Sequence, residues 1–241
     1  MPRPPIKSVA TELFTGFHVA YAVLLDYVLN HGNTYECDRS GLMVECMNLS
    51  FGMLHPQGNF AGNSRIDLHY AEALWEWVKS GSGDPKHLIE LRPTVAKFHD
   101  PDFNTAYGPR IAKQMPALME LLYTQANSRR GMIFIGDSED NKIWFKKTTA
   151  EYPCTNSLQF MVRGGRLHMV VDMRSNNMVS TICYDVFMFT SLMMDVADKL
   201  ELEYGYYYHN IGSAHIMQRD VEFAKKVVYK SGMEEVTRDF T

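Results

Sequence analysis

The sequence lacks several features that would assign it to a broad class of protein at once. Its 241 residues include only four cysteines, and none of them forms a CxxC pair. A small disulfide scaffold needs a much higher cysteine density, so reduced thiols are the simplest interpretation. No apolar run approaches the roughly 20 residues that cross a bilayer, and no basic segment followed by an apolar run opens the chain. We therefore expect a soluble, unsecreted protein in the cytoplasm.

Strong charge and common ligand-binding motifs are also scarce. The formal net charge is −4, so no broad basic surface for nucleic acid is expected. The chain has no HxxxH or paired Cys/His spacing, which argues against a metal site, and no GxxxxGK or GxGxxG loop. With 46% apolar residues, the chain can build one sizeable core. We expect a single domain over residues 1–241.

Hydrophobic periodicity predicts a mixture of helices and strands. Apolar residues recur at helical spacing from Glu12 to Asn30, before Gly32, and from a cap at Asn63 or Ser64 to Gly81. Three further helices are expected from Pro116 to about Gln125, from Val186 to Leu200, and over "RDVEFAKKVVYKSG". Strands are expected at "GMIFIG", on both sides of Gly164 and Gly165, and at "YGYYYHNIGSAHIM". The irregular order of these elements indicates an α/β or α+β fold.

One cysteine stands out because it directly follows a proline and precedes a strand-like run, "EYPCTNSLQF". A thiolate is the strongest carbon nucleophile among side chains near neutral pH, so Cys154 is a candidate nucleophile. A small buried apolar residue is the alternative. Arg129, Arg130 and Arg174 flank this segment, and guanidinium groups suit phosphate oxygens, although a single arginine more often lies on a solvated face or pairs with a carboxylate. Glu72, Asp185 and His215 likewise have purely structural alternatives.

The order of several motifs resembles the thymidylate synthase family, and most closely its phage deoxycytidylate hydroxymethylase branch. The resemblance runs from about Tyr21 to Asp220 and is strongest from Asn127 onward. It rests on "CDRSG", "EALW", "AYGPR", "SRRG", "PCTNSLQF", "MRSNNMVSTICYD" and "IGSAHI", in that order. The spacings from Cys154 to Gln159 and from Arg174 to Asp185 match the family without insertion. The family's fold would be one α/β domain whose large sheet packs back to back against its twin in a homodimer.

This resemblance implies a role for each matched residue. Cys154 would add to C6 of the pyrimidine, so that C5 attacks the methylene group of 5,10-methylenetetrahydrofolate. Glu72 would organise water and proton transfer, and Tyr107 would assist removal of the C5 proton. The substrate-binding residues would be Arg39, Arg129, Arg130, Arg174, Ser175, Asn156, Gln159, Asp185 and His215, with Arg129 and Arg130 reaching across from the second subunit. The folate-binding residues would be Asn177, Glu72 and Trp75. Asn177 and Met217 depart from the family pattern, which has aspartate and tyrosine there.

Asp185 is the residue that would choose the base. Synthases that act on uracil carry asparagine at this position, whose amide offers one donor and one acceptor. A carboxylate offers only acceptors, which suit the N4 amino group of cytosine and a protonated N3. The resemblance therefore predicts dCMP as substrate and 5-hydroxymethyl-dCMP as product, formed in the host cytoplasm if a phage encodes the protein. A dCMP C5-methylase, which would use hydride in place of water, and a catalytically silent nucleotide binder remain as alternatives.

Overall fold

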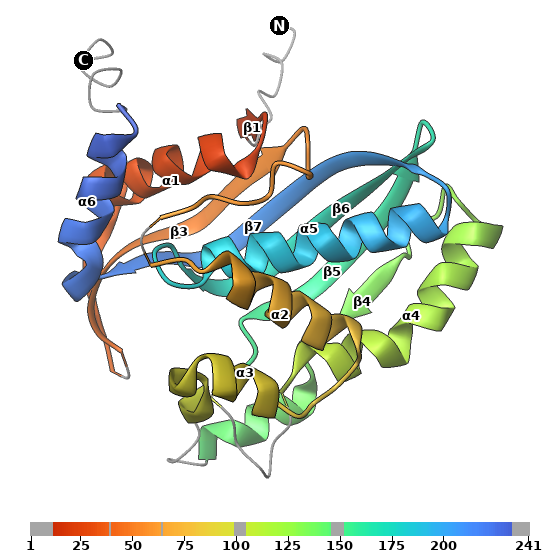
Figure 1. Cartoon of the computed structure of the whole chain (residues 1–241), viewed down its shortest axis with the longest axis horizontal. Coiled ribbons are helices and arrows are strands. Elements are labelled where there is room, and N and C mark those ends of the chain that lie inside the picture. Colours follow the sequence, from red (N-terminus) through yellow and green to blue (C-terminus); the bar gives the residue numbers. More distant parts are fainter. Residues whose placement is uncertain (1–11, 39, 64, 99–104, 146–151, 233–241) are drawn as a thin grey trace, which may run out of the picture.

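A seven-stranded mixed sheet lies at the centre of the chain (Figure 1). The computed structural model describes residues 12–38, 40–63, 65–98, 105–145 and 152–232. The strand order is β1-β3-β7-β6-β5-β4, and β2 pairs with β3 at one end. The strands are β1 (Glu12–Phe14), β2 (Asn33–Cys37), β3 (Gly41–Met53), β4 (Met132–Phe134), β5 (Thr155–Arg163), β6 (Arg166–Asn177) and β7 (Glu203–Met217).

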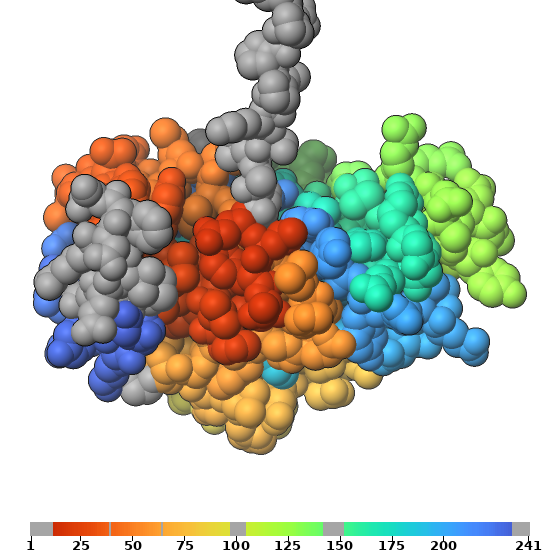
Figure 2. All heavy atoms as spheres, turned by 90° about the horizontal axis from the view of Figure 1, so that it is seen from above, coloured from red at the N-terminus to blue at the C-terminus, as the bar shows by residue number. Residues whose placement is uncertain are grey.

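The helices gather mainly on one face of this sheet (Figure 1). They are α1 (Phe17–His31), α2 (Leu68–Lys79), α3 (Lys86–Leu91), α4 (Tyr107–Thr124), α5 (Ile182–Lys199) and α6 (Val221–Lys230), with 3-10 turns at Pro93–Phe98, Ser138–Phe145 and Gln218–Asp220. Helix α5 crosses the middle of the sheet, and α2 packs on α5. Seen from above, α1 and α6 lie together at one end, away from the β5–β6 hairpin (Figure 2). None of the helices in the described ranges is long and apolar enough to cross a membrane.

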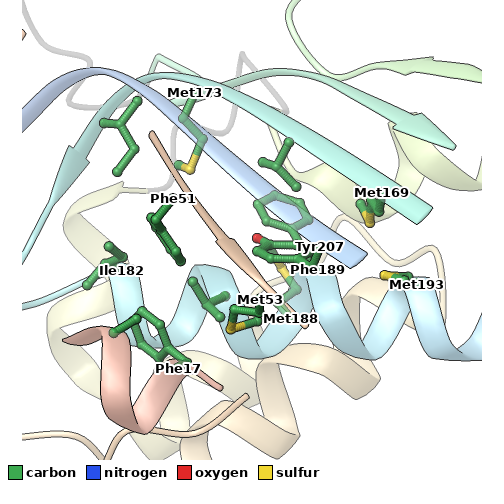
Figure 3. Packing of buried hydrophobic residues seen from close by; sticks show 14 of the residues in the cluster. Phe17, Phe51, Met53, Met169, Met173, Ile182, Met188, Phe189, Met193 and Tyr207 are labelled. Carbon is green, nitrogen blue, oxygen red and sulfur yellow. The ribbon is translucent and has the colours of Figure 1, made fainter. Parts of the chain in front are cut away.

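The core forms between the sheet and α1 and α5. Alternate residues of β5, β6 and β7 point toward the helices and are buried, as the two-residue period of a strand requires. Figure 3 shows Tyr207 of β7 meeting Phe189 and Met188 of α5, with Phe51 of β3 and Phe17 of α1 nearby. This arrangement confirms the expected α/β mixture with a large mixed sheet.

The β5–β6 hairpin has the turn that the paired glycines predict. Gly164 and Gly165 have φ values of +58° and +75°, both in the left-handed region that glycine adopts without steric cost. The strand at β4, the long strand β7, the helix that begins near Asp185 and the last helix also lie where periodicity placed them.

Three helix boundaries differ from the sequence prediction. Residues Glu12–Phe14 form a strand parallel to β3, so the first helix begins only at Phe17. The second helix is capped by Asp67, whose carboxylate accepts from the backbone N–H of His69 at 2.9 Å. Helix α4 begins at Tyr107, and Pro116 lies inside it on an exposed face. Solvent can satisfy the carbonyl that loses its partner there, which is why this proline is tolerated.

A buried ion pair fastens the start of α4 to the segment after β4. Arg110 donates from both terminal nitrogens to Asp140 at 2.6 Å, and Arg110 Nη1 also donates to the Ile135 carbonyl at 2.5 Å. Asp140 is only 2% exposed and accepts a further bond from the backbone N–H of Asp137 at 2.8 Å. These contacts set the position of the helix that carries Tyr107.

Replacing Asp140 with alanine should therefore lower the free energy of unfolding strongly. The Arg110 guanidinium would lose its partner in a largely buried setting, which costs about 3 kcal/mol. Urea denaturation followed by circular dichroism measures the loss. Glu222→Ala, which removes an exposed partner of Lys225, is the matched control and should leave the midpoint unchanged. Equal midpoints for the two variants would contradict the assigned role of Asp140.

Candidate active site

A cavity of about 330 Å³ opens where α2, α4 and α5 meet the start of β5. Four of the residues predicted for the site lie on its wall: Cys154, Arg174, Tyr107 and Asp185. The rest of the wall is largely apolar and consists of Leu74, Trp77, Val78, Thr105, Ala106, Tyr152, Pro153, Thr181 and Met188. Residues up to 114 positions apart in the sequence, counted from Leu74 to Met188, thus enclose one space.

Arg174 holds the segment that carries Cys154. Its Nε donates to the Pro153 carbonyl at 2.8 Å, and one Nη donates to the Tyr152 carbonyl at 2.9 Å. The same nitrogen lies 3.7 Å from Cys154 Sγ. The backbone N–H of Arg174 also donates to the Cys154 carbonyl at 2.8 Å. A guanidinium at this distance favours the thiolate form of the cysteine.

Tyr107 occupies the first position of α4 and stacks on Phe189, with 6.1 Å between ring centroids. Its hydroxyl accepts from the backbone N–H of Thr155 at 3.3 Å and from Thr155 Oγ1 at 3.2 Å. Burial raises the pKa of the Tyr107 phenol, and the nearby Cys154 and Asp185 raise it further. Tyr107 therefore stays protonated, with both oxygen lone pairs engaged and its own proton available to another acceptor.

Asp185 lies in the first turn of α5, with its carboxyl on the cavity wall. Burial raises the pKa of this carboxyl from 3.8 to about 7, against the opposing effect of hydrogen bonds from Thr181 and Asn176. The desolvation cost thus exceeds the gain from two donors. Near neutral pH this group can hold or release a proton at small cost, as a group that transfers protons must.

Two predicted residues on α2 lie elsewhere in this structure. Glu72 is exposed and lines a separate surface hollow of about 760 Å³ together with His69 and Glu76. Trp75 is half-buried, and Lys79 Nζ lies 5.6 Å from its ring centroid. The roles of Glu72 in proton transfer and of both residues in folate binding stay predictions.

Strands β6 and β7 bring the predicted sugar and folate residues together. Asn177 and His215 are register partners, as are Ser175 and Ser213. Asn177 Oδ1 accepts from the backbone N–H groups of Val179 and Ser180, both at 2.9 Å, so it shapes the turn before α5. Burial lowers the pKa of His215, whose Nδ1 lies 3.3 Å from the Ser213 carbonyl. His215 is therefore a neutral hydrogen-bonding group.

The remaining predicted residues lie outside the cavity wall. Arg129 and Arg130 are exposed after α4, and Arg130 donates to Gln125 Oε1 at 2.7 Å. On β5, Gln159 donates to the Arg129 carbonyl at 2.9 Å, and Asn156 donates to Asp172 at 3.1 Å. Arg39 lies outside the described residues.

Sequence reasoning missed several residues that line or support the cavity. Trp77, and not Trp75, forms part of its wall, and helical spacing alone could have favoured Trp77 because it shares a face with Leu74 and Tyr70. Thr181 and Asn176, which hydrogen-bond Asp185, gave no sequence signal. Within the described part of the chain, no group of three or more His, Cys, Asp or Glu side chains could hold a metal ion.

The burial of Asp185 predicts that its replacement by asparagine stabilises the protein above neutral pH. The unfolded carboxyl releases its proton near pH 3.8 and the folded one near pH 7. As the pH rises from 3.8 to about 7, the unfolded state gains stability relative to the folded state, because only the unfolded carboxyl ionises. Above pH 7 the folded protein carries the full cost of a buried carboxylate. A difference of one pKa unit between the folded and unfolded states corresponds to about 1.4 kcal/mol. Asp185→Asn should therefore raise the free energy of unfolding by about 1 to 4 kcal/mol at pH 8.

Urea denaturation at pH 8 and at pH 4 tests this expectation. The gain should shrink at pH 4, where the folded carboxyl holds its proton and the unfolded one is only partly ionised, so most of the penalty is absent. Asp198→Asn, at the far end of the same helix, is the control and should show no such difference between the two pH values. An equal or lower stability of Asp185→Asn at pH 8 would contradict the burial argument.

Comparisons with known proteins agree with this architecture. The family model described as thymidylate synthase matches residues 65–237. A protein of Methanocaldococcus jannaschii is 28% identical over 211 residues, covering 86% of this chain and 90% of that one. The thymidylate synthase of Bacillus mojavensis is 27% identical over 168 residues, and the match covers 64% of this chain and 58% of the relative.

A solved structure shows the same fold. The thermostable thymidylate synthase A from Bacillus subtilis superposes with a TM-score of 0.71 at 21% identity, covering 89% of this chain and 84% of that chain. The family match spans the cavity wall from Leu74 to Met188, including Cys154 and Asp185. The chain belongs to the thymidylate synthase family.

Proposed function

We propose that the protein is a dCMP hydroxymethylase. It transfers a one-carbon unit from 5,10-methylenetetrahydrofolate to C5 of dCMP, and water then completes the hydroxymethyl group. The observation that carries this proposal is the carboxyl of Asp185 in the same cavity as Cys154 and Arg174. A family member that reads uracil would have an amide there. The names of the relatives refer to thymidylate synthases, so the choice of cytosine rests on Asp185.

Asp185 recognises the base by sharing one proton with cytosine N3. Cytosine offers two donors at its N4 amino group and a basic N3, so Asp185 and cytosine together need one proton between them to form two hydrogen bonds. A carboxyl whose pKa is about 7 can hold that proton or leave it on N3. Protonation of N3 also withdraws electrons from C6, which favours attack by a thiolate. Uracil O4 is a much weaker base and leaves an ionised Asp185 facing an acceptor.

Cys154 supplies the nucleophile in this reaction. Its sulfur adds to C6, and the electron pair that moves to C5 makes that carbon nucleophilic toward the one-carbon unit. Arg174 both favours the thiolate and keeps the side chain of Cys154 in place through the bonds to Pro153 and Tyr152. The exposed side of its guanidinium is suited to the 5′-phosphate, joined by Arg39 and Ser175.

The residues present suit a folate beside this thiol. Leu74, Trp77, Val78 and Met188 form an apolar wall of the kind that accepts a flat aromatic ring. Bound folate supplies the methylene group at the oxidation level of formaldehyde. Tyr107, whose phenol stays protonated, would assist removal of the C5 proton, which passes to solvent water. Departure of tetrahydrofolate would leave an exocyclic methylene on C5, and addition of water to it gives CH2OH. Release of the Cys154 sulfur from C6 then frees the product, so that dCMP has a net gain of CH2O.

The outer face of the sheet supports a dimer. Several apolar side chains there stay exposed, among them Phe134 at 59% and Met47 at 82%. Residues of β5, β6 and β7 that alternate with the buried ones, such as Met161, Val170 and Tyr208, are only partly covered. A second copy packed on this face would bury them. Arg129 and Arg130, exposed beside the edge strand β4, would then reach the phosphate of the neighbouring subunit.

Mass spectrometry of dCMP incubated with the protein and 5,10-methylenetetrahydrofolate tests the reaction. A gain of CH2O is expected with dCMP, no product with Cys154→Ala, and a shift of preference toward dUMP with Asp185→Asn. Asp185→Asn removes the contact between two acceptors, the carboxylate and uracil O4. The ratio of product formed from dCMP to product formed from dUMP should therefore fall by about 10- to 100-fold. A gain of CH2 would identify a methylase, product from dUMP alone would refute the cytosine assignment, and no product from any substrate would favour a silent binder.

Subunit mixing tests the shared site. Arg129→Ala/Arg130→Ala protein and Cys154→Ala protein should each be inactive. Random reassociation gives half hybrids, each with one intact site, so about a quarter of wild-type activity should return. Mixing either variant with itself is the control. If the double arginine variant is fully active, or if mixing restores nothing while hybrids form by native mass spectrometry, the arginines do not act across the interface.

A further inference from the structure

The guanidinium of Arg174 contacts an aromatic ring as well as the thiol of Cys154. Its central carbon lies 4.9 Å from the centroid of the Tyr152 ring, and one of its terminal nitrogens lies 3.7 Å from Cys154 Sγ. All three residues line the cavity. One cation is thus shared by a ring face and a sulfur, and the ring belongs to the residue two positions before the cysteine.

The ring restrains a motion that the hydrogen bonds of Arg174 leave open. The bonds from Arg174 to the Pro153 and Tyr152 carbonyls, at 2.8 and 2.9 Å, lie close to the plane of the guanidinium, because all of its donors point outward in that plane. They resist displacement out of the plane only weakly. An aromatic face attracts a cation placed over it and supplies that restraint. The side chain of Arg174 is exposed, so without the ring it would keep more of its rotamer freedom.

The Tyr152 ring is itself fixed from a separate segment. Its hydroxyl donates to Asn141 Oδ1 at 2.8 Å. Asn141 directly follows Asp140, whose buried ion pair with Arg110 fastens the start of α4. The contact that positions this helix therefore also helps to position the ring on Arg174.

Distance decides how strongly Arg174 acts on the thiol. The attraction between a guanidinium and a thiolate falls as their separation grows, and water between them screens it further. A guanidinium that left the 3.7 Å contact for solvent would lose most of this effect. A group that keeps Arg174 in place therefore keeps Cys154 reactive.

We propose that Tyr152 is a positioning residue, whose ring holds the Arg174 guanidinium beside Cys154 so that the thiolate is favoured before any nucleotide binds. Tyr152 acts on the reaction through Arg174 and not by contact with the reacting atoms. The inference rests on the proposed function for the role of Cys154 as the nucleophile. It does not depend on which base the protein selects.

The pH dependence of alkylation by iodoacetamide measures how readily Cys154 ionises. Peptide mass spectrometry follows Cys154 separately from the other three cysteines. Tyr152→Leu keeps an apolar side chain but loses the aromatic face, so the midpoint of the profile should rise by about half to one pH unit. Below the midpoint the rate should then fall about three- to tenfold. Tyr152→Phe keeps the face and loses only the bond to Asn141, so its midpoint should stay closer to that of the wild type.

The other ionisable groups on the cavity wall are the same in these proteins. Tyr107 of α4 stays protonated, and Asp185 of α5 adds a negative charge as its carboxyl ionises. Both act on the thiol of every variant alike, so the difference between midpoints reports on the ring. Tyr123→Leu is the matched control, because Tyr123 is 83% exposed and lies outside the cavity wall, and its midpoint should equal that of the wild type. If the ring merely shielded the sulfur, its loss would raise the rate at every pH and leave the midpoint in place.

A double-mutant cycle tests whether Tyr152 acts through Arg174. Arg174→Ala should raise the alkylation midpoint at least as much as Tyr152→Leu. In the combined variant the loss of the ring should add little, because the group that it positions is already absent. A midpoint in Tyr152→Leu that matches the wild type, or full additivity of the two shifts, would overturn the proposal. Equal rises in Tyr152→Leu and Tyr152→Phe would assign the effect to the hydroxyl and refute the role of the ring face.

The rate of the proposed reaction supplies the functional arm. Tyr152→Leu should lower kcat/KM for dCMP about three- to tenfold at pH 7, and the loss should largely disappear at pH 9, where the thiol ionises without help. Wild-type protein that forms no product from dCMP, dUMP or CMP would refute the proposed function, and the alkylation midpoints would still decide the role of Tyr152. An active wild type with an equal loss at both pH values, or with no loss, would refute the role of Tyr152 alone.

Discussion

The desolvation of one carboxyl group, that of Asp185, is the constraint on which the rest of the site depends. A carboxylate in an apolar cavity is costly unless donors or a proton compensate it. Asn176 and Thr181 supply donors, and the pKa of about 7 records that they offset only part of the cost. Near neutral pH the carboxyl is therefore close to the midpoint of its titration. There it can share a proton with the basic N3 of cytosine, and uracil offers no such basic nitrogen.

On the side of the cavity where Cys154 lies, a single arginine holds the backbone and the thiol in place. Cys154 precedes β5, and Arg174 of β6 clamps the two residues before it through backbone carbonyls. The β5–β6 hairpin places these residues side by side, and its glycine turn fixes the register. One arginine therefore links sheet geometry, the position of the nucleophile and its ionisation. The opposite wall, formed by Leu74, Trp77 and Val78 of α2 and Met188 of α5, is apolar and strengthens each of these electrostatic contacts by excluding water.

Motif order and spacing picked out four residues that line one cavity, because Cys154, Tyr107, Arg174 and Asp185 belong to short stretches whose local geometry is decided nearby. Where long-range pairing decides, sequence reasoning failed. Residues Glu12–Phe14 read as helix but pair with β3. Strand β3 itself escaped notice because Asn48, at φ +57°, breaks the alternation of its side chains.

Helix α2, which carries Glu72, Trp75 and Trp77, shows most clearly what sequence periodicity cannot predict. Periodicity identified the helix, but the choice between neighbouring faces depends on how α2 rolls against α5, which no local pattern encodes. The support of Asp185 was equally invisible, since Asn176 lies on β6 and looks like an ordinary strand residue. Its polar character makes sense only once its burial is known.

The parallel pairing of β6 with β7 has a consequence for how the chain folds. The two strands are joined by the whole of α5, so they cannot pair until that crossover has closed. Asp185 is on this crossover, in the first turn of α5, and its donor Asn176 is on β6. We therefore expect the carboxyl to stay hydrated until the crossover has packed on the sheet. The penalty of burying it would then act mainly on the rate at which the finished protein reopens and little on early folding.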